Sequence, residues 1–225
     1  MTDTPRLILF DVDGTLVDSR KHIIFCMEAG FKSANEQPPS PEEIIGVVGL
    51  TLKISVEQLR PNFSPDTVSQ IVLGFRQAYL HIYNSHSRKP SSPLFPYARE
   101  ILEELHLKSC FILGIATGNS RQGMESFIKE HRLESFFKTT QCTDYHPSKP
   151  HPAMIYSALL ETGIDKYNTA IIGDTSFDIK MGVQAGVKTI GVSWGYHDVA
   201  DLVMADYLVN DFRQIPELLR VIWDE

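Results

Sequence analysis

Five short apolar runs, each followed by a polar turn and a helical pattern, constrain the fold of this 225-residue chain more than any other feature. A continuous apolar run without alternation is typical of a strand buried on both faces of a parallel sheet. The runs are Leu7–Phe10, Phe111–Ala116, Ala170–Gly173, Thr189–Val192 and Tyr207–Val209. The helical patterns cover Tyr97–Leu107, Ser120–His131, Pro152–Thr162, Phe177–Ala185 and Phe212–Trp223. Strands that alternate with helices predict a doubly wound, Rossmann-like α/β core with a mostly parallel sheet.

Residues 19–92 interrupt this alternation with helical patterns and no convincing buried strand. Ser40–Glu43 has the pattern of a capping box with proline at the first helical position, and Ser64–Asp66 opens a longer helix that could run to about His86. The breaker stretch Lys89–Pro93 closes the interval. We therefore predict two domains, an α/β core of residues 1–18 and 93–225 and an inserted small helical cap of residues 19–92. Such an insertion would lie over the carboxyl end of the first strand, where open α/β sheets bind ligands.

The composition excludes several classes of protein. With 43% hydrophobic and 22% charged residues the chain is neither disordered nor of low complexity. A formal net charge of −7 makes it a poor partner for nucleic acid or an anionic membrane. No apolar run approaches the roughly 18 residues of a membrane span, and the N-terminus lacks a signal-peptide pattern. Cys26, Cys110 and Cys142 have no metal-ligand spacing and fit a reducing compartment, so we expect a cytoplasmic protein.

The first predicted strand ends in two carboxylates, Asp11 and Asp13, followed by Gly14. Side chains two residues apart would point the same way if the strand continued. Gly14 allows a sharp turn, which would bring backbone N–H groups near whatever lies before Asp11. An ordinary strand-to-turn junction is the alternative, because Asp-Gly is a common turn pair. This motif alone does not decide between a site and a turn.

Two further motifs suit an anion. Thr117–Ser120 follows the second apolar run, and a hydroxyl, a glycine and a helix start together form a corner that can donate hydrogen bonds to phosphate oxygens. The alternative is that Asn119 or Ser120 only caps the next helix. Lys149 lies in a proline-rich stretch that would fix its direction, and it would be a point charge of the kind that phosphate sites use. An isolated surface lysine is the alternative there.

A second pair of carboxylates follows the third apolar run. Asp174 lies at the predicted strand end, and Asp178 lies four residues later, about one turn into a helix. Acidic residues near a helix start are often only caps. Two acids on one side of the turn could instead hold Mg²⁺, which prefers a few carboxylates together with water and phosphate oxygen.

Because each motif follows a buried strand, all four are expected to converge on one edge of the sheet. In their order the sequence resembles the haloacid dehalogenase-like hydrolase superfamily, specifically its phosphatases with a small helical cap inserted after the first motif. The resemblance covers essentially the whole chain and rests on Asp11–Thr15, Thr117–Asn119, Lys149, Gly173–Asp178 and Met181–Gly186.

The resemblance implies a phosphoric monoester hydrolase that uses Mg²⁺ as cofactor. Asp11 would be the nucleophile that forms an aspartyl-phosphate, and Asp13 would be the general acid and base. The metal would be held by the Asp11 carboxylate, the Asp13 backbone carbonyl and Asp174, with Asp178 supporting them indirectly or through water.

The remaining motifs would bind the phosphoryl group of the substrate. Thr117, the amides of Gly118 and Asn119, and Lys149 would contact its oxygens, and Thr117 and Lys149 would also act in catalysis. A phosphate monoester brings about two negative charges to an acidic site, and Mg²⁺ plus Lys149 would supply about three positive ones.

Departures within the family narrow the reaction. Relatives that act on haloacids lack a carboxylate at the position of Asp13, and phosphomutases usually have Val at the position of Thr15, so both residues favour phosphate hydrolysis. The resemblance is greatest to phosphoglycolate phosphatases, through Asp11–Ser19 and a cap of about 70 residues, and makes 2-phosphoglycolate the expected substrate. Pyrophosphatases, sugar-phosphate phosphatases and phosphomutases share the outline and stay as alternatives. The cap loop Val48–Thr51 would reach the reaction centre.

Two readings from other classes stay open. A phospho-accepting signalling module also combines aspartates, a Thr and a Lys around Mg²⁺, but its phosphorylated Asp follows an earlier acidic pair on a middle strand. A non-catalytic binding protein on the same fold would have lost Asp11 or Asp13, and both are present. The expected partner is a small phosphorylated metabolite, and the sequence fits a monomer and a homodimer equally.

Overall fold

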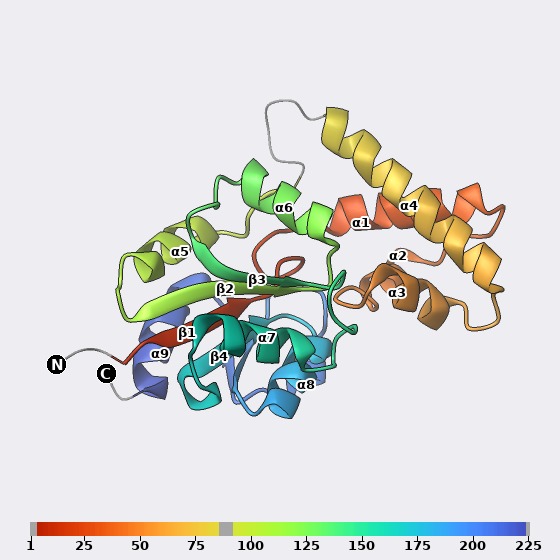
Figure 1. The fold of residues 1–225 in the computed structure, drawn as a ribbon. Helices are drawn as coiled ribbons and strands as arrows, with labels where there is room; N and C mark the ends of the chain where they lie inside the picture. The colour runs from red at the N-terminus through yellow and green to blue at the C-terminus, as the bar shows by residue number, and fades with distance from the viewer. Residues whose placement is uncertain (1–3, 86–91, 224–225) are drawn as a thin grey trace.

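The computed structural model describes residues 4–85 and 92–223, and in it six parallel strands form one sheet (Figure 1). The strands are β1 (Arg6–Phe10), β2 (Phe111–Thr117), β3 (Phe137–Cys142), β4 (Thr169–Gly173), β5 (Lys188–Val192) and β6 (Tyr207–Val209). Their order is β3-β2-β1-β4-β5-β6, which confirms the doubly wound α/β prediction. The order reverses between β1 and β4, the point where open sheets of this kind bind ligands.

Strand β3 was missed by the search for apolar runs. Its sequence, FKTTQC, is mostly polar, yet Thr139 and Gln141 are buried. Glu161 explains this burial, because its Oε2 accepts hydrogen bonds from Thr139 Oγ1 at 2.5 Å and Gln141 Nε2 at 2.8 Å. A strand whose buried side chains are polar and paired in this way leaves no hydrophobic signal in the sequence.

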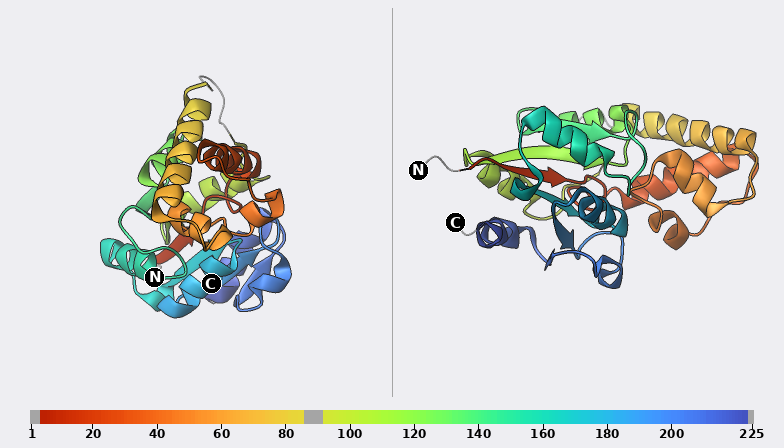
Figure 2. Two further views of the ribbon diagram at one scale, coloured as in Figure 1. Left: turned by 90° about the vertical axis from the view of Figure 1, so that its right-hand side faces the viewer. Right: turned by 60° about the horizontal axis from the view of Figure 1, so that its bottom comes forward.

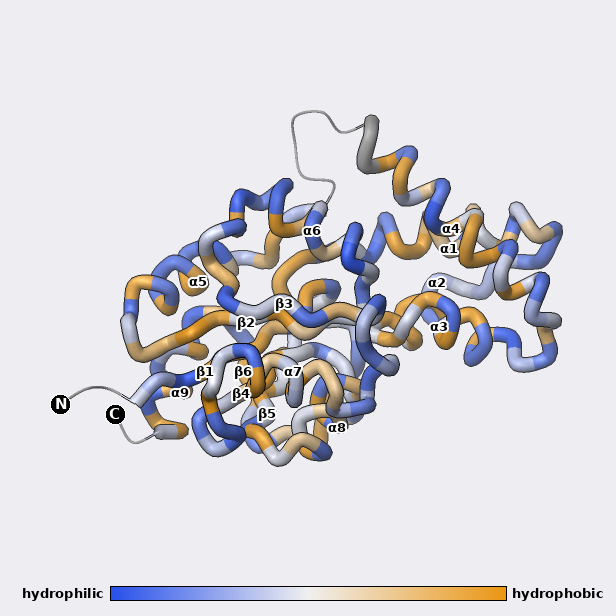
Figure 3. Tube along the Cα trace, viewed as in Figure 1, coloured by the Kyte–Doolittle hydropathy of each residue, from blue (hydrophilic) through white to orange (hydrophobic). Residues whose placement is uncertain are grey.

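Helices cover both faces of the sheet because alternate side chains of each strand point to opposite faces (Figures 1 and 2). Ile8 and Phe10 belong to one apolar layer, and Leu7 and Leu9 belong to the other. The first layer includes residues of α5 (Ala98–His106), α6 (Arg121–Glu130) and α9 (Ile215–Ile222), and the second includes α7 (Ala153–Thr162) and α8 (Ser176–Ala185). Figure 3 shows the hydrophobic colouring along β1 and β2 at the centre of the molecule.

Four helices between β1 and α5 in the chain pack on each other beyond the carboxyl ends of the strands (Figure 2). They are α1 (Arg20–Ser33), α2 (Pro41–Ile45), α3 (Leu52–Leu59) and α4 (Pro65–Ser85), and we call them the cap helices. Their own apolar cluster includes Met27, Phe31, Ile44, Val56 and Ile71. The predicted capping box is confirmed, since Ser40 and Glu43 exchange side-chain and backbone hydrogen bonds. The division of the chain into core and cap domains stays a prediction.

The two chain crossings between the sheet and the cap helices lie side by side. Val17 forms a bridge with Leu94, and the Asp18 N–H donates to the Pro93 carbonyl at 2.9 Å. The breaker residues 89–91 and the predicted helix end at His86 lie outside the described residues. Within the described part of the chain, no helix has both the length and the apolar character needed to cross a membrane.

The loop between α2 and α3 is seated on the carboxyl ends of the strands. Its Thr51 N–H donates to Ser148 Oγ at 2.9 Å, beside Lys149. Gly49 has a φ of +99°, and its backbone lies so close to Gly118 that a Cβ on Gly118 would clash with the Gly49 carbonyl. The predicted approach of the Val48–Thr51 loop to the strand ends is therefore present in the structure.

Because the Gly49 loop packs against Gly118 and not against Gly123, alanine substitutions at these two glycines should differ in their effect on stability. Gly118→Ala should lower the free energy of unfolding by about 1–3 kcal/mol, because backbone at the Gly49 loop must move. Gly123→Ala should be neutral or raise it by up to about 1 kcal/mol, because a Cβ there meets Asn119 only at ordinary contact distance and lies within a helix. Denaturant titration of both variants measures the difference, and equal effects would contradict the packing described.

Candidate active site

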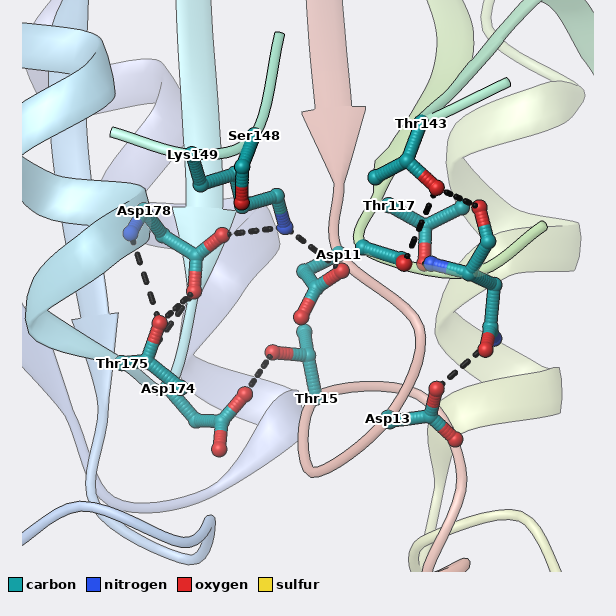
Figure 4. Close-up of polar contacts among 12 residues, drawn as sticks. Asp11, Asp13, Thr15, Thr117, Thr143, Ser148, Lys149, Asp174, Thr175 and Asp178 are labelled. Atoms are coloured by element: carbon teal, nitrogen blue, oxygen red, sulfur yellow. Dashed lines mark hydrogen bonds and ion pairs between the residues drawn. The ribbon is translucent and has the colours of Figure 1, made fainter. Parts of the chain in front are cut away.

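Buried Lys149 joins two carboxylates at the edge of the sheet (Figure 4). Its Nζ lies 2.8 Å from Asp11 Oδ1, just after β1, and 2.6 Å from Asp178 Oδ1 on α8. Burial by itself lowers the pKa of Lys149, but the two carboxylates raise it above its ordinary value, so the ammonium stays charged. The reading of Lys149 as an isolated surface lysine is therefore wrong.

Asp178 holds the lysine from the first turn of α8. Its Oδ2 accepts hydrogen bonds from Thr175 Oγ1 at 2.6 Å and from the Thr175 N–H at 3.1 Å, as part of a capping box. Its Oδ1 contacts Lys149. With both oxygens engaged, Asp178 caps the helix, as one of its two alternatives expected, and it also orients Lys149, which the sequence did not indicate. Its part in a metal site stays a prediction.

Asp174 is fixed from two sides. Thr15 Oγ1 donates to its Oδ1 at 2.8 Å, and the Tyr196 N–H donates to its Oδ2 at 2.8 Å. The turn after Asp13 makes room for it, because Gly14 has a φ of +87° and any Cβ there would collide with the Asp174 carboxylate. Thr15 thus positions a carboxylate in addition to distinguishing family members by sequence.

The three buried carboxylates fit a divalent cation. Oxygens of Asp11, Asp174 and Asp178 lie within 4.8 Å of one another, while Lys149 brings one positive charge against their three negative ones. Neither oxygen of Asp11 has a hydrogen-bond partner, and only its Oδ1 is paired with Lys149. An unsatisfied buried carboxylate oxygen is costly without a cation or a proton. Hard oxygen donors of this kind match the preference of Mg²⁺.

Burial and the excess of negative charge raise the pKa values of Asp11 and Asp174. Burial raises the pKa of Asp11 to about 7; Lys149 opposes this shift and Asp178 adds to it. Burial, together with Asp11 and Asp178, also raises the pKa of Asp174 well above its usual range. In the absence of a cation the centre therefore holds protons that an exposed aspartate would have lost.

Asp13 does not point the same way as Asp11, because β1 ends at Phe10 and the chain turns (Figure 4). Its Oδ1 accepts from Ser19 Oγ, and its Oδ2 accepts from Asn119 Nδ2 at 2.7 Å. Burial raises the pKa of Asp13, and these two hydrogen bonds oppose that rise. The condition for a common orientation of the pair, a strand that continues past Phe10, is therefore not met.

Ser19 is itself held by Tyr196. The Ser19 N–H donates to Tyr196 Oη at 2.8 Å, and the two hydroxyl oxygens lie 3.1 Å apart. The single Ser19 hydroxyl proton goes to Asp13, and the Tyr196 hydroxyl donates to Asp18 Oδ1 at 3.5 Å. Tyr196 is buried, and no motif in the sequence indicated that it reaches Asp13 through Ser19.

In the corner after β2 the structure shows the helix cap that the alternative expected, while binding of an anion there stays a prediction. Thr117 is buried, its Oγ1 accepts from the Asn119 N–H at 3.2 Å, and Ser120 Oγ caps α6. Thr143, just after β3, donates to the Asn119 carbonyl at 2.9 Å and fixes the turn. Thr143 was missed together with β3, and its position next to a polar strand gave no signal.

A cavity of about 350 Å³ connects these groups to the cap helices. Asp11, Asp13 and Thr117–Ser120 line one part of it, and residues of α1, α3, α4 and the loop at Gly49 line the rest. The predicted site residues are thus gathered at one edge of the sheet. Their roles as nucleophile, acid, phosphate ligand and metal ligand stay predictions.

A doubly wound sheet with a buried acidic centre at its switch point and a cavity above it is typical of α/β proteins that bind a ligand at the strand ends. The chain belongs to the haloacid dehalogenase-like hydrolases, because the model of that family matches residues 8–192. This assignment confirms the resemblance found in the sequence and makes the protein an enzyme of the hydrolase class.

Relatives across the whole chain agree with this assignment. Pyrophosphatase PpaX from Anoxybacillus flavithermus is 31% identical over 191 residues, which cover 83% of each protein. Phosphoglycolate phosphatase from Mannheimia succiniciproducens is 27% identical over 230 residues, covering 96% of this chain and 98% of that protein. A haloacid dehalogenase-like family hydrolase from Streptococcus pneumoniae has a TM-score of 0.81 at 29% identity, covering 97% of this chain and 99% of that one. The chain therefore groups with family members that are named phosphatases.

The raised pKa of Asp11 predicts how the metal-free protein responds to pH. The pKa of Asp11 is about 7 in the folded state and about 3.8 in the unfolded state, so the folded state keeps the Asp11 proton up to a higher pH. The free energy of unfolding therefore falls as pH rises from 4 through 7. Asp11→Asn stays neutral and should unfold about 2–6 °C above wild type at pH 8 in a chelator, with the difference vanishing near pH 4. Calorimetric scans across this range test it, and a difference independent of pH would contradict it.

Proposed function

We propose that this hydrolase is a Mg²⁺-dependent phosphatase that cleaves a small phosphate monoester through an aspartyl-phosphate on Asp11. The observation that carries the proposal is the buried Asp11 carboxylate, which has an oxygen without a hydrogen-bond partner and lies between Lys149 and a cavity lined by Thr117–Asn119. A nucleophile needs an oxygen that is not already engaged, and neighbouring donors must stabilise the charge of the transferring group.

The reaction would proceed in two steps, transfer of the phosphoryl group to Asp11 and hydrolysis of the aspartyl-phosphate. An Asp11 oxygen forms a bond to phosphorus as the bond to the ester oxygen breaks, and Asp13 gives its proton to that departing oxygen. Asp13, now a carboxylate, then takes a proton from the water that attacks the aspartyl-phosphate, which releases phosphate and restores Asp11. Ser19 and Asn119 each donate to one oxygen of Asp13, and each oxygen keeps a second lone pair that can take up the transferred proton.

The phosphoryl oxygens would be held by Lys149, the Thr117 hydroxyl and the amides of Gly118 and Asn119, at the start of α6. Asp11, Asp174 and the Asp13 carbonyl would hold Mg²⁺, with Asp178 acting through Lys149 or through water. When bound, the cation supplies the positive charge that the three carboxylates and the incoming phosphate need.

The names of two relatives suggest which two substrates to test first. 2-Phosphoglycolate, the substrate expected from the sequence, is supported by the name of the Mannheimia relative, and pyrophosphate by that of the Anoxybacillus relative. Sugar phosphates, mutase chemistry and a phospho-accepting or non-catalytic role stay as alternatives. We also propose a reducing, cytoplasmic location, supported by three cysteines that are buried and have no metal-ligand spacing in the sequence.

The direct test is phosphate release from an aryl phosphate, 2-phosphoglycolate and pyrophosphate, with Mg²⁺ and with EDTA. Wild type should release phosphate only with Mg²⁺, and Asp11→Asn should lose at least about a thousandfold in rate, because the nucleophile is gone. Asp165→Asn is the matched control, since Asp165 caps a distant turn and asparagine also caps well.

Acid quenching during turnover of ³²P-labelled ester should trap a phosphoryl group on Asp11 in wild type and none in Asp11→Asn. Unchanged activity in Asp11→Asn, or equal activity in EDTA, would reject the mechanism. A phosphorylated protein that persists without turning over would instead favour the signalling reading.

A further inference from the structure

The cap helices line their part of the cavity with several apolar side chains, although a substrate as small and polar as 2-phosphoglycolate has no apolar group to contact them. The wall of the cavity there includes Ile23 and Met27 of α1, Leu52 of α3, and Val72 and Phe75 of α4. Ile23, Leu52, Val72 and Phe75 are only partly buried, so their carbon atoms still face the cavity. Apolar surface that lines a concave site gains from contact with an apolar ligand.

The size of the cavity points the same way. About 350 Å³ lies within the range of about 300–1,000 Å³ that encloses drug-sized ligands. The cavity is also continuous with Asp11 and Thr117, so a phosphoryl group placed there would direct its leaving group toward the cap helices. Glycolate would fill little of that space and would leave the apolar wall in contact with water.

Cationic side chains are sparse in this wall. Among the described residues that line the cavity, Lys53 and Arg76 carry positive charge. Lys53 Nζ lies 3.7 Å from Glu57 Oε1 and is thus paired with a carboxylate. Arg76 is exposed on α4, beyond the apolar positions Val72 and Phe75 in the chain.

We infer that the leaving group of the physiological substrate carries an apolar body of about six or more carbon atoms, in contact with Val72 and Phe75. The inference rests on the proposed phosphatase function and replaces the two-carbon acid with a larger substrate class, phosphate monoesters of apolar or aromatic alcohols. It makes Phe75 a specificity-determining residue.

A homologous series of esters isolates this property. Ethyl, butyl and hexyl phosphate have leaving groups of nearly equal basicity, so differences in kcat/KM report contacts with the leaving group and not the chemistry. Burial of each added methylene should raise kcat/KM by up to about fourfold, and we expect at least about a tenfold rise from ethyl to hexyl phosphate. Hexyl phosphate should also exceed 2-phosphoglycolate.

Two variants on α4 assign the effect to the wall. Phe75→Ala should flatten the rise of kcat/KM with chain length, and a calorimetric scan of the variant establishes that it is folded. Leu73→Ala is the matched control, because Leu73 is 56% exposed on the same helix and does not line the cavity. Val72→Thr, which keeps the volume but adds a hydroxyl, should reduce the rise with less risk to packing.

The outcomes separate the inference from the function on which it rests. A flat series, a preference for 2-phosphoglycolate, or an unchanged slope in Phe75→Ala would overturn the inference and leave the phosphatase in place. No Mg²⁺-dependent phosphate release from any ester, together with no phosphoryl group trapped on Asp11, would reject both.

Discussion

At one edge of the sheet, buried carboxylates outnumber the positive charges that pair with them, and this imbalance is the constraint on the rest of the site. Asp11, Asp174 and Asp178 are all buried within reach of one another, and Lys149 is the cation paired with two of them. Such an arrangement is unfavourable unless protons, a metal ion or both complete it. The surrounding residues maintain it: Thr15 and the Tyr196 N–H hold Asp174, and Thr175 holds Asp178. The raised pKa of Asp11 and the fit for a divalent cation have the same origin.

The fold brings these groups together because parallel strands end at a common edge. β1 delivers Asp11, β2 delivers Thr117 and β4 delivers Asp174, while the loop before α7 brings Lys149 between them. The cap helices then enclose a cavity over this edge, and the Gly49 loop is seated directly on Gly118. The proposed reaction divides chemistry from specificity. The strand ends would hold the reacting groups, and the cap helices would provide the surface that meets the leaving group.

Much of this could be predicted from the sequence, because buried parallel strands are apolar and their ends carry the polar motifs. Asp11, Lys149, Asp174 and Asp178 were predicted to converge, and the structure places them together. Strand β3 could not be found in this way, since Thr139 and Gln141 are polar and are stabilised by Glu161, a partner 20 or more residues away. The direction of Asp13 depends on where β1 ends, and the support from Ser19 and Tyr196 depends on a contact between residues 177 positions apart. Periodicity and local motifs carry no information on contacts of that range.

The most direct test of the account is a calorimetric titration of the metal-free protein with Mg²⁺ at pH 8. If the buried carboxylates form the cation site, wild type binds one Mg²⁺ per chain, and Asp174→Asn weakens binding at least about tenfold, or about 1.4 kcal/mol. Asp165→Asn, outside the centre, binds as wild type does. Equal Mg²⁺ affinity in wild type and Asp174→Asn, or no binding by wild type, would contradict the central role of this charge-deficient centre.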